Sequence, residues 1–109
     1  MELQERIIKV ATQLFLENGV KNITMNRLVQ ELHTSKRTLY QYFEDKTALV
    51  KVCLFTYYAK IREDNEAVIK ASDNAIEAMG RLFQKVVFRD SQVNPNFFKD
   101  IIKLCKEYE

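Results

Sequence analysis

The stretch "TSKRTLYQYFEDK", residues 34–46, decides the fold because it predicts a short helix between two capping residues. Ser35 has the hydroxyl that an N-cap needs, and Asp45 can cap the helix that follows. Leu39 and Phe43 are apolar and four positions apart, so they share the face that packs inward. The other side chains are bases, hydroxyls, an amide and tyrosines. The outer face of this helix therefore carries more hydrogen-bonding capacity than packing requires.

Composition indicates helices throughout the chain. It has 109 residues, of which 47% are hydrophobic, with only two glycines and one proline. Turn-forming residues are thus scarce, and the length fits one domain, or one small domain plus part of another. The formal net charge is +2, with a small basic excess in the first 60 residues. Such a bias suits contact with a polyanion but does not decide the function.

Two helices are predicted before the opening stretch. The first has apolar residues at helical spacing and should end at Asn18, where Gly19 supplies a left-handed residue. The second is short, begins after the N-cap Thr24, and should bury Met25, Leu28, Val29 and Leu32. Only a few residues then separate it from the helix capped by Ser35. Two helices joined by so short a turn predict a helix-turn-helix.

Three longer helices are predicted after it. One begins after Asp45 and reaches about residue 70, a second covers 75–87, and a third opens with Asn94 as cap and Pro95 in its first turn. We expect an all-α fold with a three-helix head, a long linking helix and two further helices. Residues 1–45 would form the head and 46–109 the linking helix with part of a second domain, with a weak stretch near 65–74. Gly80, inside a strongly periodic helix, suggests a close helix contact.

A helix-turn-helix can place its second helix in the major groove of DNA. Arg37 and Gln41 share one face of that helix, and both can make bidentate contacts with base edges. Other side chains, together with the helix N-termini at Thr24 and Ser35, suit phosphate oxygens. Those side chains are Thr38, Tyr40, Tyr42 and Lys46. The alternative is a solvated surface helix with half-buried tyrosine rings; the order of capped helix, glycine stop, short helix, tight turn and loaded helix favours DNA binding.

This arrangement and its residues resemble the tetracycline-repressor (TetR) family of bacterial transcriptional regulators. The resemblance covers roughly residues 5–55, from "ERIIKVATQLFLENGV" through "ITMNRLVQELHTSKRTLYQYFEDKTALV". It implies a DNA-binding head, a helical regulatory domain, and repression relieved by a small molecule. It also implies that Lys36, Arg37 and Gln41 face the bases, sometimes with Asn26, while Thr38, Tyr40, Tyr42 and Lys46 hold phosphates.

The sequence departs from the family pattern in the turn. His33 and Thr34 stand where glycine and valine are frequent, and Arg37 replaces another frequent glycine. We expect His33 to adopt a left-handed conformation, which histidine tolerates better than most residues. A lone imidazole makes no metal site. Arg37 would give this protein its own base preference, or would bind phosphate.

The expected function is a sequence-specific regulator, most simply a repressor that binds a pseudo-palindromic operator as a homodimer and is released by a small-molecule effector. A pocket for that effector would use Phe55, Tyr58, Met79 and Phe83, which ordinary core packing explains equally well. The competing interpretation is a helical protein–protein interaction module that does not bind DNA. Little in the sequence suits catalysis, so we expect no enzyme activity, no cofactor and no metal.

The remaining expectations concern location and completeness. The N-terminus is acidic where a secretion signal is basic, and no apolar run approaches the roughly 20 residues of a membrane span. A cytoplasmic protein without membrane contact is expected. Cys53 and Cys105 are predicted to be buried, reduced thiols. The chain stops in mid-pattern at "CKEYE", so we expect a fragment of a longer protein, with the apolar faces at 75–87 and 97–108 covered by a partner or a missing segment.

Overall fold

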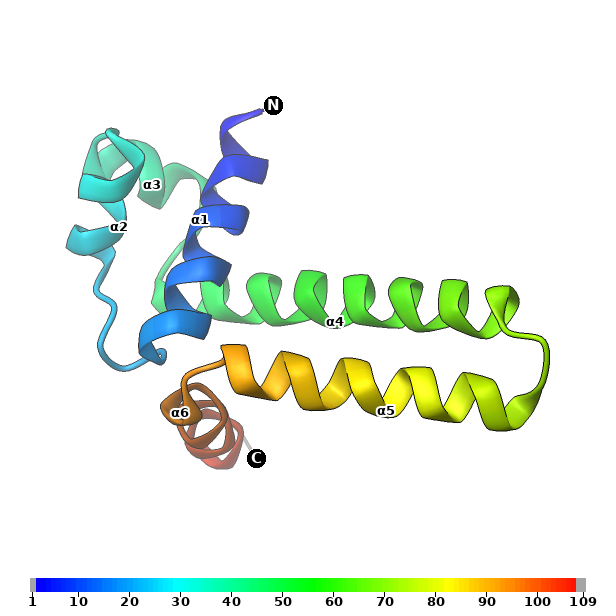
Figure 1. Ribbon diagram of the computed structural model, residues 1–109. Coiled ribbons are helices and arrows are strands. Elements are labelled where there is room, and N and C mark those ends of the chain that lie inside the picture. The colour runs from blue at the N-terminus through cyan, green and yellow to red at the C-terminus, as the bar shows by residue number, and fades with distance from the viewer. Residues whose placement is uncertain (1, 108–109) are drawn as a thin grey trace.

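The computed structural model of the protein describes residues 2–107, except the side chains of Cys105 and Glu107. Within that range it has six α-helices and no strand, which confirms the all-α prediction (Figure 1). None of these helices combines the length and the apolar character that crossing a membrane would need. The helices are α1 (Leu3–Asn18), α2 (Met25–Leu32), α3 (Lys36–Tyr42), α4 (Lys46–Ala71), α5 (Ala75–Gln92) and α6 (Pro95–Glu107).

The first three helices gather at one end of the molecule, around the start of α4 (Figure 1). Their apolar residues recur at helical spacing, so each helix presents one stripe to a common core. The most deeply buried side chains of this core are Ile7, Ala11, Phe15, Ile23, Leu28, Leu32, Leu39, Leu49 and Val50. The two shortest helices, α2 and α3, are therefore fixed by packing rather than by their own length.

The longest helix, α4, crosses α1 and then extends away from the head, and α5 returns beside it in the opposite direction (Figure 1). A short bend at residues 93–94 leads into α6, which packs below the end of α1. Val93 and Phe97 are buried against the head core. The chain thus comes back to the head after leaving it, and α6 becomes a neighbour of the α1–α2 turn.

The predicted helix caps are confirmed. Thr24 Oγ1 accepts the N–H of Arg27 at 3.1 Å, and Asp45 Oδ1 accepts that of Ala48 at 2.8 Å. At the start of α6, Asn94 Oδ1 accepts the N–H of Asn96 at 2.9 Å, with Pro95 as the first helical residue. Each cap satisfies a backbone donor that the first turn of a helix leaves without a partner.

Two details of the helix breaks differ from expectation. Gly19 does end α1, but its φ of 84° is combined with a ψ of 162°, so it lies outside the left-handed helical region while still in the φ range that favours glycine. The weak stretch near residues 65–74 does not interrupt α4, which continues to Ala71 before the chain turns at 72–74. Burial on one side stabilises this segment despite its polar sequence.

The apolar face of α5 is largely exposed in the described structure. Ile76, Met79 and Phe83 are 84%, 71% and 69% exposed, and Ala78 is the residue of this helix that is buried. The close contact expected at Gly80 is wrong, because a Cβ atom built there meets no other atom within 4 Å. Tyr108, at the end of the apolar face predicted for α6, lies outside the described residues.

Cys53 is buried, as predicted, with 3% of its surface exposed. Its Sγ atom lies 3.7 Å from the carbonyl oxygen of Ile8, to which the thiol donates a weak hydrogen bond. Burial raises the pKa of this thiol from 9.0 to about 11, and a smaller effect of Thr12 opposes the rise. A thiol held neutral in this way is a packing residue, since the reactive form is the thiolate.

Candidate nucleic-acid interface

The turn between α2 and α3 sets the direction of α3. His33 has φ 53° and ψ 43°, which confirms the predicted left-handed conformation. Its N–H donates to the carbonyl of Gln30, and the N–H of Thr34 donates to that of Val29, both at 3.3 Å. The Arg6 guanidinium, from α1, donates to the carbonyl oxygen of Leu32 at the end of α2. These bonds close α2 in three residues and hold the turn against α1.

The buried face of α3 determines which side chains point outward. Leu39 and Phe43 are 0% and 5% exposed, which confirms that they anchor the helix. Each residue of an α-helix is rotated by about 100° from the one before, so Arg37 and Gln41 lie on the side opposite to this anchor. Both are exposed. The two side chains that best suit base edges thus occupy the centre of the outer face of α3.

The remaining polar residues of α3 flank that centre. Tyr40 and Tyr42 lie about 100° to either side of Gln41 and are 40% and 44% exposed. Their rings are therefore half-buried, as the solvated-surface interpretation also expected, while enough surface remains for contact. Thr38 is partly exposed, and its hydroxyl lies 2.7 Å from that of Ser35. Lys36 is exposed in the first turn.

The N-termini of α2 and α3 present the polar groups expected of them. Ser35 Oγ accepts the N–H of Thr38 at 3.1 Å, as Thr24 does for α2. Asn26, in the first turn of α2, is exposed. The N-terminal turns of both helices carry positive dipole ends toward solvent. Arg27 is held by Glu31, with Nε and Oε1 3.1 Å apart, so its charge is already paired.

Lys46, at the start of α4, is partly buried. Burial lowers the pKa of its ammonium group, and the nearby carboxylate of Asp100 opposes that change by favouring the charged form. Asp100 belongs to α6, so the lysine expected to hold a phosphate also faces an acidic group from the other end of the chain. The sequence did not indicate this neighbour.

The four residues expected to line an effector pocket do not share one cavity in the described structure. Phe55 and Tyr58, on α4, border a shallow hollow together with Arg62 and Glu66, and they are 79% and 68% exposed. Met79 and Phe83, on α5, are not among the residues that line it. The ordinary-core alternative does not describe these side chains either, since all four are mostly exposed.

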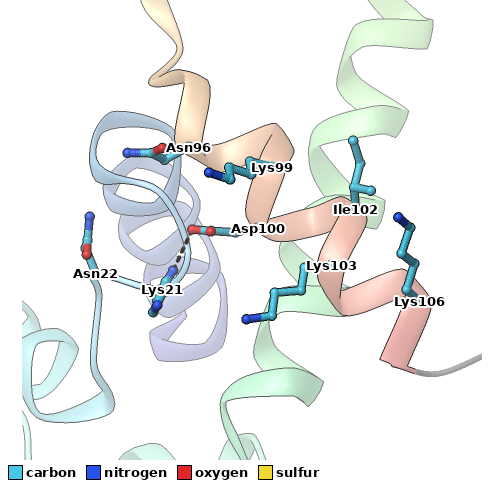
Figure 2. Close-up of a pocket in the computed structure, with 8 residues that line it drawn as sticks. All are labelled: Lys21, Asn22, Asn96, Lys99, Asp100, Ile102, Lys103 and Lys106. Carbon is cyan, nitrogen blue, oxygen red and sulfur yellow. Dashed lines mark hydrogen bonds between the residues drawn. The ribbon is translucent and has the colours of Figure 1, made fainter.

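Sequence reasoning missed a hollow between the α1–α2 turn and α6, shown in Figure 2. The pattern "KDIIKLCK", with lysines four and three positions apart, was the signal that could have found its α6 side. In residues 2–107, no group of three or more described His, Cys, Asp or Glu side chains is placed to bind a metal ion. The hollow is lined by Lys21, Asn22, Asn96, Lys99, Asp100, Ile102, Lys103 and Lys106.

Comparison with known proteins agrees with this geometry. Residues 7–53, which hold α1, α2, α3 and the start of α4, match the family described as "Bacterial regulatory proteins, tetR family". The chain carries the N-terminal domain of the tetR family. The TetR resemblance seen in the sequence is thereby confirmed, and the helix-turn-helix lies where it was predicted.

Relatives of this tetR-family chain include HTH-type transcriptional regulators of Staphylococcus aureus strains USA300, NCTC 8325 / PS 47 and COL. Each is 37% identical over 70 residues, covering 58% of this chain and 38% of the relative. The matched stretch is thus well under half of these relatives. No solved structure matches the chain.

Proposed function

We propose that this tetR-family chain is a sequence-specific, DNA-binding transcriptional regulator that inserts α3 into the major groove. The observation that carries the proposal is the position of Arg37 and Gln41 on the exposed side of α3, opposite its buried anchor. A helix presented in this way by a helix-turn-helix is the usual reader of base edges. The matched relatives are named HTH-type transcriptional regulators, which supports the same function.

The residues divide into readers and holders. Arg37 and Gln41 would contact bases, with Lys36 and Asn26 at the edge of the same surface. Phosphate contacts fix the position of a protein on the duplex without reading its sequence, and polar groups around the centre of α3 are suited to them. Those residues are Thr24, Ser35, Thr38, Tyr40, Tyr42 and Lys46.

The regulator would act as a repressor and a homodimer on a pseudo-palindromic operator. Support comes from the exposed apolar side chains of α5, such as Ile76 and Phe83, which are the kind of surface that another chain covers. Two-fold symmetry would then place the two α3 helices about one DNA turn apart, or a multiple of it. A small-molecule effector bound beside α4 and α5, near Phe55, Tyr58, Met79 and Phe83, would release the operator.

We also propose that the protein is a cytoplasmic regulator rather than an enzyme, without cofactor, metal or membrane contact. The same apolar face of α5 favours one competing function, a helical module that binds another protein and no nucleic acid. The two functions differ in what the exposed groups of α3 are for. Under the competing function, Arg37 and Gln41 would be ordinary solvated residues.

Selection from a pool of random duplex DNA at two salt concentrations tests the proposal. We expect recovery of a defined site made of two inverted halves, with retention falling as salt rises because counterions are released on binding. Retention without sequence enrichment would contradict sequence-specific regulation. No retention at either salt concentration would favour the interaction module.

A further inference from the structure

The hollow beside α6 has a strongly cationic lining. Lys99, Lys103 and Lys106 come from α6 and Lys21 from the α1–α2 turn, and Asp100 is the one carboxylate in the lining. The three α6 lysines are four and three positions apart, so they lie within about 60° of one another around the helix. Figure 2 shows their side chains projecting from α6, with Asp100 directed at Lys21.

Asp100 does not neutralise this cluster. Its Oδ2 atom accepts the backbone N–H of Lys21 at 2.8 Å, and its charge also acts on the ammonium group of Lys46. The ion pairs found among the described side chains join arginines to glutamates elsewhere, on α2, on α4 and on α5. The α6 lysines take part in none of these pairs. Their charge therefore remains available to an anion.

The cationic lining is continuous with the proposed DNA-binding surface. A second hollow, lined in part by Lys46, Thr47 and Val50 from the start of α4, shares Lys21, Asp100 and Lys103 with the first. The surface that begins at Lys46, a proposed phosphate contact, thus continues along α6. This continuity gives the cluster a position relative to DNA that an isolated patch of lysines would lack.

The arrangement suits a polymer of phosphates better than a small ligand. Seven residues of α6 advance by about 10 Å, which is the axial length of about three phosphates on one DNA strand. Small-molecule sites are usually enclosed, mostly apolar and supplied with a few oriented polar groups. Here Lys99, Lys103 and Lys106 are all exposed on a helix surface.

We propose that Lys99, Lys103 and Lys106 of α6, together with Lys21, form a second phosphate-binding surface that holds the DNA backbone flanking the site read by α3. The inference rests on the proposed DNA binding and extends it, because it gives α6, which lies outside residues 7–53, a direct role in the complex. Contacts of this kind fix register and add affinity without reading sequence.

The test compares three triple variants of the full chain. Lys99→Gln, Lys103→Gln and Lys106→Gln together remove the α6 charges, and the corresponding Lys→Arg variant keeps them. The matched control, Lys60→Gln, Lys70→Gln and Lys85→Gln, makes the same charge change on α4 and α5. We expect the α6 glutamine variant to lose about 10- to 100-fold in affinity at 0.1 M salt and to reduce the slope of log K against log salt by about 2 to 3. Its hydroxyl-radical footprint should shorten at the flank, with the selected site sequence unchanged.

The arginine variant should keep the affinity, the slope and the footprint of the unmodified protein. Equal losses in the α6 and control glutamine variants would overturn the inference, because the effect would then be one of net charge. If the unmodified protein binds duplex DNA without sequence preference, sequence-specific reading fails, but the slope comparison still decides the role of α6. If it binds no duplex DNA, both proposals fail.

A separate arm distinguishes DNA phosphates from a free phosphate ligand. Inorganic pyrophosphate is titrated into the protein without DNA, with thermal stabilisation as the readout. Saturable stabilisation that the α6 glutamine variant loses, together with an unchanged salt slope on DNA, would assign the hollow to a small phosphate ligand and overturn the inference. Absence of saturable stabilisation, with the reduced slope, would support DNA.

Discussion

The Asp100 carboxylate accepts the backbone N–H of Lys21 at 2.8 Å, which joins residues 79 positions apart in the chain. Asn94 adds two bonds beside it, from its backbone N–H to the carbonyl of Leu16 at 2.8 Å and from Nδ2 to that of Glu17 at 3.1 Å. The start of α6 is thus fastened to the end of α1 and to the turn that leads into the helix-turn-helix. Any movement of α6 would therefore be transmitted to the head.

Gly19→Ala should loosen this fastening. The φ of Gly19 is 84°, and a Cβ atom there would lie 3.0 Å from Cβ of Asn96 and 3.1 Å from Oδ2 of Asp100. Both the backbone conformation and the contact oppose a side chain. We expect the free energy of unfolding to fall by about 1 to 3 kcal/mol. Urea denaturation at a fixed protein concentration measures it, and an unchanged midpoint would mean that α6 does not pack on this turn in solution.

Gly80→Ala is the matched substitution with the opposite expected sign. Gly80 lies inside α5, has no positive φ, and its added Cβ would meet no atom within 4 Å. Alanine is favoured over glycine in a helix interior, so the free energy of unfolding should rise by about 1 kcal/mol. The same urea titration decides it. A decrease would show that another surface packs against α5 at this point.

The local features of the head could be predicted from sequence because their causes lie within a few residues. A cap hydroxyl bonds to an N–H three positions on, and the left-handed conformation of His33 follows from the need to turn the chain between two capped helices. The inward direction of Leu39 and Phe43 follows from their spacing alone. Each prediction used chemistry that a short window contains.

What could not be predicted depends on how distant helices cross. Spacing shows that α5 has an apolar face, but not whether another surface covers it, and Met79 and Phe83 prove to be exposed. Likewise the α6 lysines share a face by their spacing, whereas their position beside Lys21 and Lys46 requires α6 to return to the head. Long-range packing of this kind leaves no pattern within a single helix.

Cys53 should resist thiol reagents over a wide pH range. Burial raises the pKa of its thiol to about 11, so the folded protein keeps the proton between pH 9 and 11 while the unfolded chain loses it. The contribution of this thiol to stability is therefore complete below pH 9 and is lost as pH rises through 11. Alkylation at pH 8.5, followed by peptide mass analysis, should label Cys53 slowly without denaturant and rapidly in 6 M urea. Equal labelling under both conditions would contradict its burial.

Specificity and affinity should separate in two substitutions on the proposed DNA surface. Arg37→Ala removes a side chain at the exposed centre of α3, so it should cost about 1 to 3 kcal/mol on the selected site and relax the preference at one or two base pairs of each half. Lys46→Gln should instead weaken binding to all sequences alike and reduce the salt slope by about 1. Both are measured by titrating labelled duplexes, matched and mutated, at several salt concentrations, with helical content by circular dichroism as the folding control. If Arg37→Ala changed only the salt slope, this arginine would be a phosphate contact, and base reading would fall to Gln41 and its neighbours.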